Sequence, residues 1–562
     1  MNLIILVRIL MLNVEYKNVI KKYVLKEKKL LSFIFIVSIV SSVLALMTPR
    51  ITQEIIDKSL PNKEKELFII HITILFLAYI FTIICSVLGN YLSNKITENI
   101  KMSLRIDMLK SITKAKYETI KHEGLGNVLS KYENEIEIIA SNTGEALVQL
   151  VSNILSLLLT CLAIYLISWK VFIFTGIVIF LYLINNHFWG EKVNILSEKY
   201  MKTNAKTIDY FSDIYNNILN VKIYNLYRKI NKKFRNVYAQ QYKADISLEL
   251  TYNLNIYIGA LLVYLLIVIV WFVGGNLYFS NNFSIGLIIT LTSYQAMLIT
   301  PINNISSFFN GYKETLVAID RFYSVINLPK EVENSKKTLK KIDSIRWNNV
   351  EFYYENSKNP VLKTGNFSVC CGDVIGLIGN SGGGKSTITK ILLRLVDKSG
   401  GYIEVNNQQI EDFSITDIRR HIAYVPQDSL FFKESIKENL FLNQERDEDE
   451  FLYLCKKLQI DTYINELPGG WNTELQTNGN NLSGGQKKRL DIIRAILTGA
   501  DVIVFDEPTA SLDNSSREAF YELVNSMKNN KIIFIISHNP DEMKYFSKIF
   551  WVTEGTIKER IF

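Results

Sequence analysis

The chain has 562 residues, of which 48% are hydrophobic, and its mean hydropathy is +0.12. A positive mean over this length argues against a wholly soluble protein and for a large membrane domain joined to a soluble one. The formal net charge of +8 comes mostly from Lys and Arg in the connections between apolar stretches, so it requires no nucleic-acid partner.

Residues 1–29 are predicted to be a cytoplasmic N-terminal segment. Its start, Asn2–Leu12, is apolar except for Arg8. This stretch is too short to span a bilayer and has no small-residue cleavage site, so a signal peptide is not expected. Two interpretations stay open: an interfacial elbow helix, or a translation start at Met11 instead of Met1.

Residues 30–326 are predicted to form a six-span transmembrane domain with long cytoplasmic helical extensions. Six apolar stretches lack Asp, Glu, Lys and Arg, and each is close to the length of about twenty residues that a helical span requires. Their number and length exclude the buried helices of a soluble core. The stretches are Leu30–Met47, Leu67–Leu92, Ala146–Ile167, Val171–Phe188, Asn253–Val273 and Phe283–Thr300.

Basic residues gather on one side of this domain. Residues 1–29 carry seven Lys or Arg, 93–145 carry eight and 190–250 carry eleven, whereas 168–170 carry one and 274–282 carry none. By the positive-inside rule, the amino terminus, both long connections and the C-terminal domain face the cytoplasm. The Lys-, Asn- and Ile-rich composition indicates an AT-rich bacterial genome, so the plasma membrane of a bacterium is the expected location.

Polar side chains inside the spans have two interpretations. Thr290, Tyr294 and Met297 share one face of the sixth span, with Ser293 and Gln295 beside them. They either line a pathway through the membrane or hydrogen-bond to neighbouring helices. The absence of charge in the spans argues against a strongly charged small substrate, but it does not separate lipid, peptide and hydrophobic drug.

After a polar, Lys-rich linker at 327–345, residues 346–562 are predicted to form an α/β domain. The apolar run 374–378 is followed by a glycine-rich loop, Lys-Ser-Thr and a helix, which is the order of a phosphate-binding P-loop. Glycines let backbone N–H groups turn toward a phosphate, and the helix adds its positive end. The predicted phosphate-binding residues are Gly379, Asn380, Ser381, Gly382, Gly383, Gly384, Lys385, Ser386 and Thr387.

Further segments follow the P-loop in a fixed order. They contain Gln427 in a turn, the pentapeptide Leu482 to Gln486, the strand end Asp506-Glu507, Asp513, and His538 after the next apolar run. With the P-loop, this ordered set resembles the nucleotide-binding domain of ABC transporters over residues 346–562. The fold class that the resemblance implies is a multi-domain membrane protein with a six-helix exporter-type domain followed by an α/β P-loop ATPase domain.

The resemblance implies a role for each of these residues. Glu507 would polarise the attacking water as general base, while Gln427 and His538 would complete the catalytic set. Lys385 would reach the β- and γ-phosphates of ATP, and Ser386, Gln427 and Asp506 would bind Mg²⁺. Tyr354 would stack on adenine, with Tyr353 as the alternative. At the start of the helix that follows, Ser483, Gly484 and Gly485 would present free N–H groups to the ATP bound to the opposite protomer, and Gln486 and Asp513 would serve the same ATP.

The chain carries one set of these motifs, so a complete site requires a second half-transporter. Intact Glu507 and His538 favour a homodimer over a pair with a different chain. Segments Ile112–Lys121 and Tyr210–Asn220 are candidates for the helices that contact the ATPase domains in exporters. The five cysteines are expected to be reduced, without disulfides.

The predicted function is export of a peptide, lipid or hydrophobic drug by alternating access, driven by ATP hydrolysis. Two alternatives stay open. One is an importer with an exporter-like fold, and the other is a nucleotide-gated channel or regulator, which the intact Glu507 disfavours.

Overall fold

The computed structural model describes residues 13–280, 283–331, 337–354, 359–380, 382–442 and 444–560. The predictions for Asn2–Leu12 and Ser381 lie outside these residues. The chain divides into two compact units. The first comprises Met1–Ile112 and Leu125–Asn327, and the second comprises Thr113–Gly124 and Leu328–Phe562.

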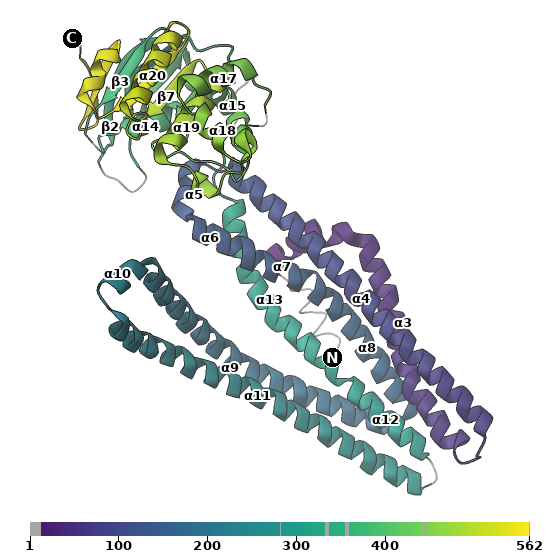
Figure 1. Ribbon diagram of the computed structural model, residues 1–562. Coiled ribbons are helices and arrows are strands. Elements are labelled where there is room, and N and C mark those ends of the chain that lie inside the picture. The colour runs from purple at the N-terminus through teal and green to yellow at the C-terminus, as the bar shows by residue number, and fades with distance from the viewer. Residues whose placement is uncertain are drawn as a thin grey trace. The chain divides into compact units, whose positions relative to one another are not determined.

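The first unit is helical (Figure 1). Among the described residues, six helical segments are long and apolar enough to cross a membrane, which confirms the six predicted spans. The helices are α2 (Val14–Val19), α3 (Lys28–Glu54), α4 (Lys65–Lys114), α6 (Leu125–Ser130), α7 (Ile136–Thr143), α8 (Glu145–Ile167), α9 (Trp169–Asn216), α10 (Ile218–Ile223), α11 (Tyr227–Phe279), α12 (Ile285–Met297) and α13 (Ile299–Ile326).

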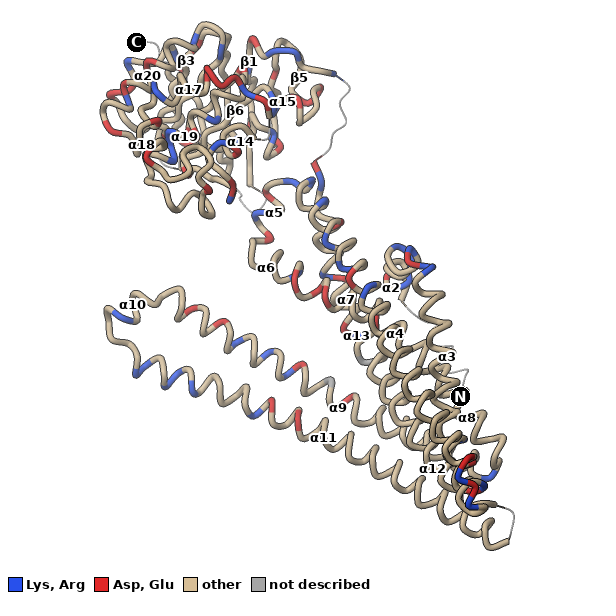
Figure 2. Tube along the Cα trace, turned by 45° about the vertical axis from the view of Figure 1, so that its right-hand side comes forward, with Lys and Arg blue, Asp and Glu red and all other residues tan. Residues whose placement is uncertain are grey.

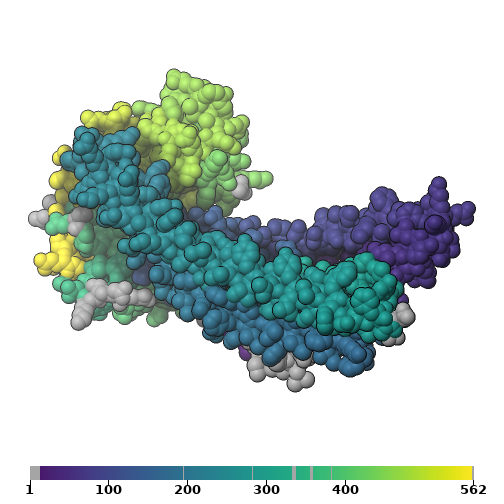
Figure 3. All heavy atoms as spheres, turned by 90° about the horizontal axis from the view of Figure 1, so that it is seen from below, coloured from purple at the N-terminus to yellow at the C-terminus, as the bar shows by residue number. Residues whose placement is uncertain are grey.

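Helices α9 and α11 are much longer than a bilayer requires. They contain 48 and 53 residues, so they extend about 72 and 80 Å at 1.5 Å per residue, against about 30 Å of hydrocarbon. Figure 1 and Figure 3 show them side by side, joined at α10. Charged residues lie toward the α10 end of the pair in Figure 2, so the apolar part is confined to the other end.

Several polar side chains of the sixth span bond to neighbouring helices. The Thr290 hydroxyl donates to the Pro49 carbonyl at 3.1 Å, and the Tyr294 hydroxyl donates to the Leu46 carbonyl at 2.8 Å. The amide of Gln295 donates to a threonine of α9 at 2.7 Å. All three side chains are buried, so the helix-bonding interpretation applies to them.

The second unit contains, among its described residues, a ten-stranded sheet of order β5-β4-β1-β2-β10-β9-β3-β8-β7-β6. Strands β3, β8, β7 and β6 pair in parallel. Their continuous apolar runs fit a sheet that is covered on both faces. The strands are β1 (Ser344–Phe352), β2 (Leu362–Cys370), β3 (Val374–Ile378), β4 (Gly400–Val405), β5 (Gln408–Gln409), β6 (Ile422–Val425), β7 (Val502–Asp506), β8 (Ile532–Ser537), β9 (Lys548–Thr553) and β10 (Thr556–Arg560).

Helices cover this sheet, and the parallel strands end at one edge. In register, Ile378 of β3 lies opposite Ser537 of β8, and Asp506 of β7 lies opposite Ile536. The segments that follow these strands therefore meet at one edge. The helices of the second unit are α5 (Tyr117–Glu123), α14 (Lys385–Leu392), α15 (Ile415–His421), α16 (Ile436–Phe441), α17 (Glu448–Lys457), α18 (Asp461–Glu466), α19 (Gly484–Leu497) and α20 (Asn514–Met527).

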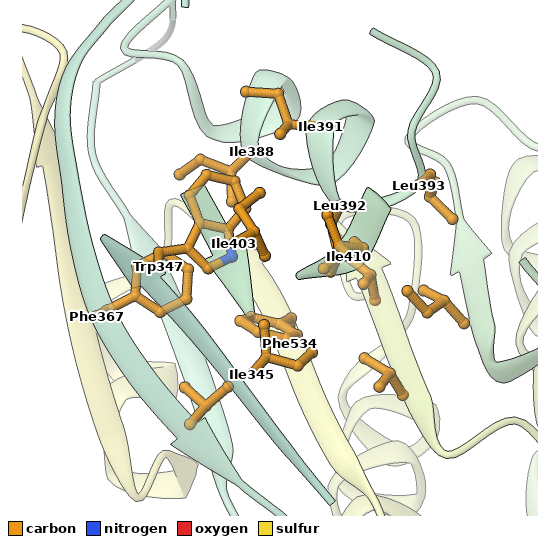
Figure 4. Packing of buried hydrophobic residues seen from close by; sticks show 14 of the residues in the cluster. Ile345, Trp347, Phe367, Ile388, Ile391, Leu392, Leu393, Ile403, Ile410 and Phe534 are labelled. Carbon is orange, nitrogen blue, oxygen red and sulfur yellow. The ribbon is translucent and has the colours of Figure 1, made fainter. Parts of the chain in front are cut away.

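Buried aromatic and aliphatic side chains pack against the sheet (Figure 4). Trp347 of β1 stacks on Phe367 of β2 with ring centroids 5.1 Å apart, and Phe534 of β8 meets Phe367 edge-on at 6.5 Å. All three rings are buried. This cluster joins the antiparallel strands to the parallel strands that carry the predicted site. The five cysteines form no disulfide among the described residues.

Replacing Phe534 by Ala should destabilise the second unit, because the ring is buried between strands and its removal leaves a cavity. We expect the free energy of unfolding to fall by about 3–5 kcal/mol. Denaturant unfolding of the full-length protein in detergent, followed by tryptophan fluorescence, measures this change. Phe432→Ala is the control, because that ring is 67% exposed, and a loss as large in the control would contradict the assignment.

Candidate active site

The glycine-rich loop joins β3 to α14 and has the backbone shape of an anion cradle. A Cβ atom added to Gly379 would lie 2.1 Å from the Val552 carbonyl oxygen, so no side chain fits there. Gly384, with φ +103°, ends the loop directly before α14, in a conformation that side chains disfavour. Asn380, Gly382 and Gly383 lie between them. The N-terminus of α14 thus opens into the loop, as a phosphate site requires.

Lys385, the first residue of α14, points back into this loop. Its Nζ donates to the carbonyl oxygens of Gly379 at 2.7 Å and Asn380 at 2.9 Å. Burial lowers the pKa of Lys385, although the carboxylates of Glu507 and Asp506 oppose that shift. A phosphate group in the cradle would favour the charged form of the ammonium and replace neutral acceptors with a charged one.

Tyr354 lies against the P-loop helix. Its hydroxyl is 3.5 Å from the Thr387 hydroxyl, its ring meets Phe352 edge-on at 4.9 Å, and the Lys390 ammonium lies 5.7 Å from the ring centre. Tyr353 is 40% exposed. Of the two tyrosines, Tyr354 therefore lies against the P-loop helix, and its role as the ring that stacks on adenine stays a prediction.

Ser386 and Asp506 bring two oxygen ligands together. The Ser386 hydroxyl is 3.4 Å from Asp506 Oδ2, and the Tyr424 hydroxyl donates to the same oxygen at 3.1 Å. Burial raises the pKa of Asp506, and the bond from Tyr424 opposes that shift. Hydroxyl and carboxylate oxygens beside a phosphate cradle are the donor set that Mg²⁺ uses with nucleotides, so these residues fit the ion.

Glu507 is held from two sides. Gln427 Nε2 donates to its Oε2 at 3.0 Å, and His538 Nε2 lies 2.9 Å from its Oε1. These three side chains follow β6, β7 and β8, three neighbouring parallel strands. Glu507 itself has φ +49°, an unusual conformation for a residue with a side chain, and its N–H donates to the Ile536 carbonyl. The structure thus brings together the three predicted catalytic residues.

Lys488 of α19 is a buried cation that the sequence analysis did not single out. Its ammonium donates to the carbonyl oxygens of Pro426 and Gln427, each at 2.8 Å, and is 3.5 Å from the Asp506 carbonyl oxygen. Burial lowers its pKa. Lys488 therefore ties the Gln427 turn to the end of β7. Its position in a run of basic residues looks like a solvated helix face, so the sequence held no local signal for this role.

Glu542 is a second missed residue, and it joins the segments after β7 and β8. Its carboxylate accepts from the Thr509 hydroxyl at 2.6 Å and from the Ser537 hydroxyl at 2.5 Å, and only 1% of the residue is exposed. Thr509 is two residues beyond Glu507, and Ser537 directly precedes His538. A buried side chain that accepts two hydrogen bonds fixes the positions of the two segments that carry Glu507 and His538.

The pentapeptide forms the start of α19 in a capping box. Ser483 Oγ accepts from the Gln486 N–H at 3.3 Å, and Gln486 Oε1 accepts from the Ser483 N–H at 2.8 Å. The expectation that the Ser483 N–H is free for an anion is therefore wrong, because the Gln486 side chain occupies it. The N–H groups of Gly484 and Gly485 lie in the first turn of α19, as predicted from the sequence.

Asp513 caps the helix that follows the catalytic strand. Its Oδ1 accepts from the Ser516 N–H at 2.8 Å as the N-cap of α20, and this bond lowers the pKa of the carboxyl group. Two residues before Asp513, the Ser511 carbonyl oxygen is 2.8 Å from where a Cβ of Gly485 would stand. The pentapeptide and the Asp513 segment therefore lie against one another.

Comparison with known proteins identifies the family of both parts of the chain. Residues 31–302 match the family described as ABC transporter transmembrane region, and residues 362–510 match the family described as ABC transporter. An export ATP-binding/permease protein of Rickettsia typhi is 26% identical over 544 residues, which cover 95% of this chain and 94% of that protein.

Other relatives and a solved structure give the same result. The lactococcin-G-processing and transport ATP-binding protein LagD of Lactococcus lactis is 26% identical over 92% of this chain and 72% of its own length. The structure of a bacterial Atm1-family ABC exporter with ATP bound matches with a TM-score of 0.80 and 20% identity, covering 95% and 94% of the two chains. With both family regions in sequence, the chain belongs to the ABC transporters, as a multi-pass membrane protein whose ATPase domain is coupled to transport.

Proposed function

We propose that this chain is an exporter half-transporter that works as a homodimer in the plasma membrane of a bacterium, with its ATPase domain in the cytoplasm. Two ATP molecules with Mg²⁺ would bind between the two ATPase domains. Their binding and hydrolysis would drive alternating access and carry a peptide, lipid or hydrophobic drug outward. The relatives' names as export proteins support the direction of transport.

The observation that carries this proposal is that Gln427 and His538 hold the Glu507 side chain beside the P-loop. A general base must be held within hydrogen-bond reach of the water that it polarises. The cradle and Lys385 would bind the phosphates, and Ser386, Gln427 and Asp506 would hold Mg²⁺. The ion would offset phosphate charge while Glu507 accepts a proton from water and His538 contacts the γ-phosphate.

Dimer formation is supported by the placement of the pentapeptide. Gly484 and Gly485 are the first residues of α19, and they lie against the segment that ends in Asp513. They are not part of the glycine-rich loop. A second copy would therefore supply the pentapeptide and Asp513 that close each nucleotide site. The alternatives, an importer of this fold or a nucleotide-gated channel, use the same site, and measurement of turnover and transport separates them.

The segment around α5 supports coupling between transport and hydrolysis. Lys116 Nζ bonds to Asp397 at 2.6 Å, and Glu118 bonds to Lys390 at 3.3 Å, all within the second unit. Lys390 also lies 5.7 Å from the Tyr354 ring centre. We propose that, through these contacts, the predicted contact segment Ile112–Lys121 responds to nucleotide binding at the ATPase site. The contact role of Tyr210–Asn220 stays a prediction.

The substitution Glu507→Gln should abolish turnover while ATP binding persists, because it removes the proton acceptor and leaves the cradle intact. We expect kcat for ATP hydrolysis to fall about 100-fold or more. Phosphate release from the full-length protein in proteoliposomes measures kcat. Native mass spectrometry of the same protein should show a species of twice 64.8 kDa.

Glu518→Gln is the matched control, since it changes an exposed acid of the same domain. Unchanged turnover in Glu507→Gln would refute the role of general base. Nucleotide-dependent conductance that persists in Glu507→Gln would favour the channel alternative, and uptake of substrate by intact cells would favour an importer. A monomer, or a complex with a different chain, would refute the homodimer.

The substitution Glu542→Ala should lower kcat more than it raises the KM for ATP. It leaves two buried hydroxyls without their acceptor and releases the segments that carry Glu507 and His538, while the P-loop keeps its contacts. We expect kcat to fall about 10- to 100-fold, and steady-state ATP hydrolysis measures both parameters.

The substitution Glu542→Gln keeps the shape and one acceptor oxygen, so it should restore most of the turnover. If Glu542→Gln is as slow as Glu542→Ala, the retained hydrogen bond does not position the catalytic segments. A rise in KM with unchanged kcat would instead place the effect on nucleotide binding.

A further inference from the structure

The first unit holds a cavity of about 290 Å³ between α3, α4 and α12. Its volume is at the lower limit of about 300–1,000 Å³ for small-molecule sites, so it fits one chemical group of a larger substrate. No charged side chain lines it. Its polar lining consists of Thr48, Thr52, Tyr79, Thr82 and Ser293.

Each of the four aliphatic hydroxyls of this lining donates its proton in a hydrogen bond within the protein. Each donates to a backbone carbonyl of its own helix, and a hydroxyl has one proton and two lone pairs. What they offer to the cavity is therefore hydrogen-bond acceptors. The bonds are Thr48 to Ala45 at 2.9 Å, Thr52 to Thr48 at 3.0 Å, Thr82 to Ala78 at 2.8 Å and Ser293 to Ile289 at 3.0 Å.

Helix α3, which forms one wall of the cavity, is fixed around Pro49. Proline has no N–H for the Ala45 carbonyl, four residues earlier, and the Thr48 hydroxyl satisfies that carbonyl instead. From α12, Thr290 and Tyr294 donate to carbonyls of the same turn of α3. The wall is thus set before a ligand binds, which lowers the ordering cost of binding.

Tyr79 supplies the complementary group. Its hydroxyl has no hydrogen-bond partner among the described residues, and the side chain is 51% exposed on α4. A phenol can donate as well as accept. The cavity therefore presents several fixed acceptors and one unused donor, with Met297 as an apolar contact.

We propose that this cavity is a subsite for a peptide-like amide group of the exported substrate, an inference that rests on the proposed export function. Two N–H groups, from a primary amide or from two neighbouring peptide groups, donate to Thr52 and Thr82, and an amide carbonyl accepts from Tyr79. A carboxylate or phosphate would meet a single donor, Tyr79, among several acceptors and no positive charge, and an ammonium would lack a counter-charge in the membrane. Of the three substrate classes, the lining fits peptides best.

Binding of small amides to the full-length transporter in nanodiscs tests the proposal. The probes are octanamide, which has two N–H groups, N,N-dimethyloctanamide, which has none, and octanoate, which only accepts. Titration calorimetry, with empty nanodiscs as blank, should show octanamide bound about tenfold or more tightly than either analogue, the effect of two hydrogen bonds.

The double substitution Thr52→Val, Thr82→Val removes the acceptors and nearly preserves side-chain shape. It should lower the affinity for octanamide about tenfold and leave the affinity for N,N-dimethyloctanamide unchanged. Thr73→Val is the matched control. Its hydroxyl makes the same type of bond on α4, to Ile69 at 2.9 Å, but it does not line the cavity, so it should leave all affinities unchanged.

Equal affinity for the two amides, tighter binding of octanoate, no binding of octanamide, or an equal loss in Thr73→Val would overturn the proposal. ATP turnover of the wild type in the same nanodiscs is measured separately. Normal turnover without selective amide binding rejects the subsite alone, whereas selective binding without turnover rejects the proposed ATP-driven function alone.

Discussion

The parallel register of β6, β7, β8 and β3 is the constraint on which the ATPase site depends. Val425 lies opposite Phe505, Asp506 opposite Ile536, and Ile378 opposite Ser537. Because side chains alternate along a strand, a slip of one residue would turn each of them to the other face. The register therefore places Gln427, Glu507, His538 and the glycine loop at one edge, although they are separated by up to 159 positions in sequence.

This constraint explains what the sequence could predict. Each strand, loop and helix start has a local pattern, so the P-loop, the Asp506-Glu507 pair and the six spans were recognisable from short segments. Lys488 and Glu542 were not, because burial depends on what packs over a residue from elsewhere in the chain. The Ser483 N–H was predicted to be free for a related reason, since its partner is a side-chain atom whose direction the motif does not encode.

The membrane domain shows the same limit on a smaller scale. Thr290 and Tyr294 face α3 and are buried, whereas Ser293, one residue before Tyr294, lines the cavity. Composition identified the span, but only packing separates residues that hold helices together from residues that are free to contact a ligand. In both units, the direction in which a hydroxyl donates its proton decides what that residue can do next.

Glu542 connects these arguments to the transport cycle. Its two donors belong to the segment that leads to Asp513 and to the strand end that carries His538. If either segment moves, the buried carboxylate loses a hydrogen bond that water cannot replace, which costs more than the loss of an exposed bond. The two segments are therefore favoured to move together. In the proposed dimer, the strand end with His538 would contact the nucleotide of its own protomer, and the segment that leads to Asp513 would face the nucleotide of the partner. The Glu542 carboxylate would therefore link the two nucleotide sites by direct contact.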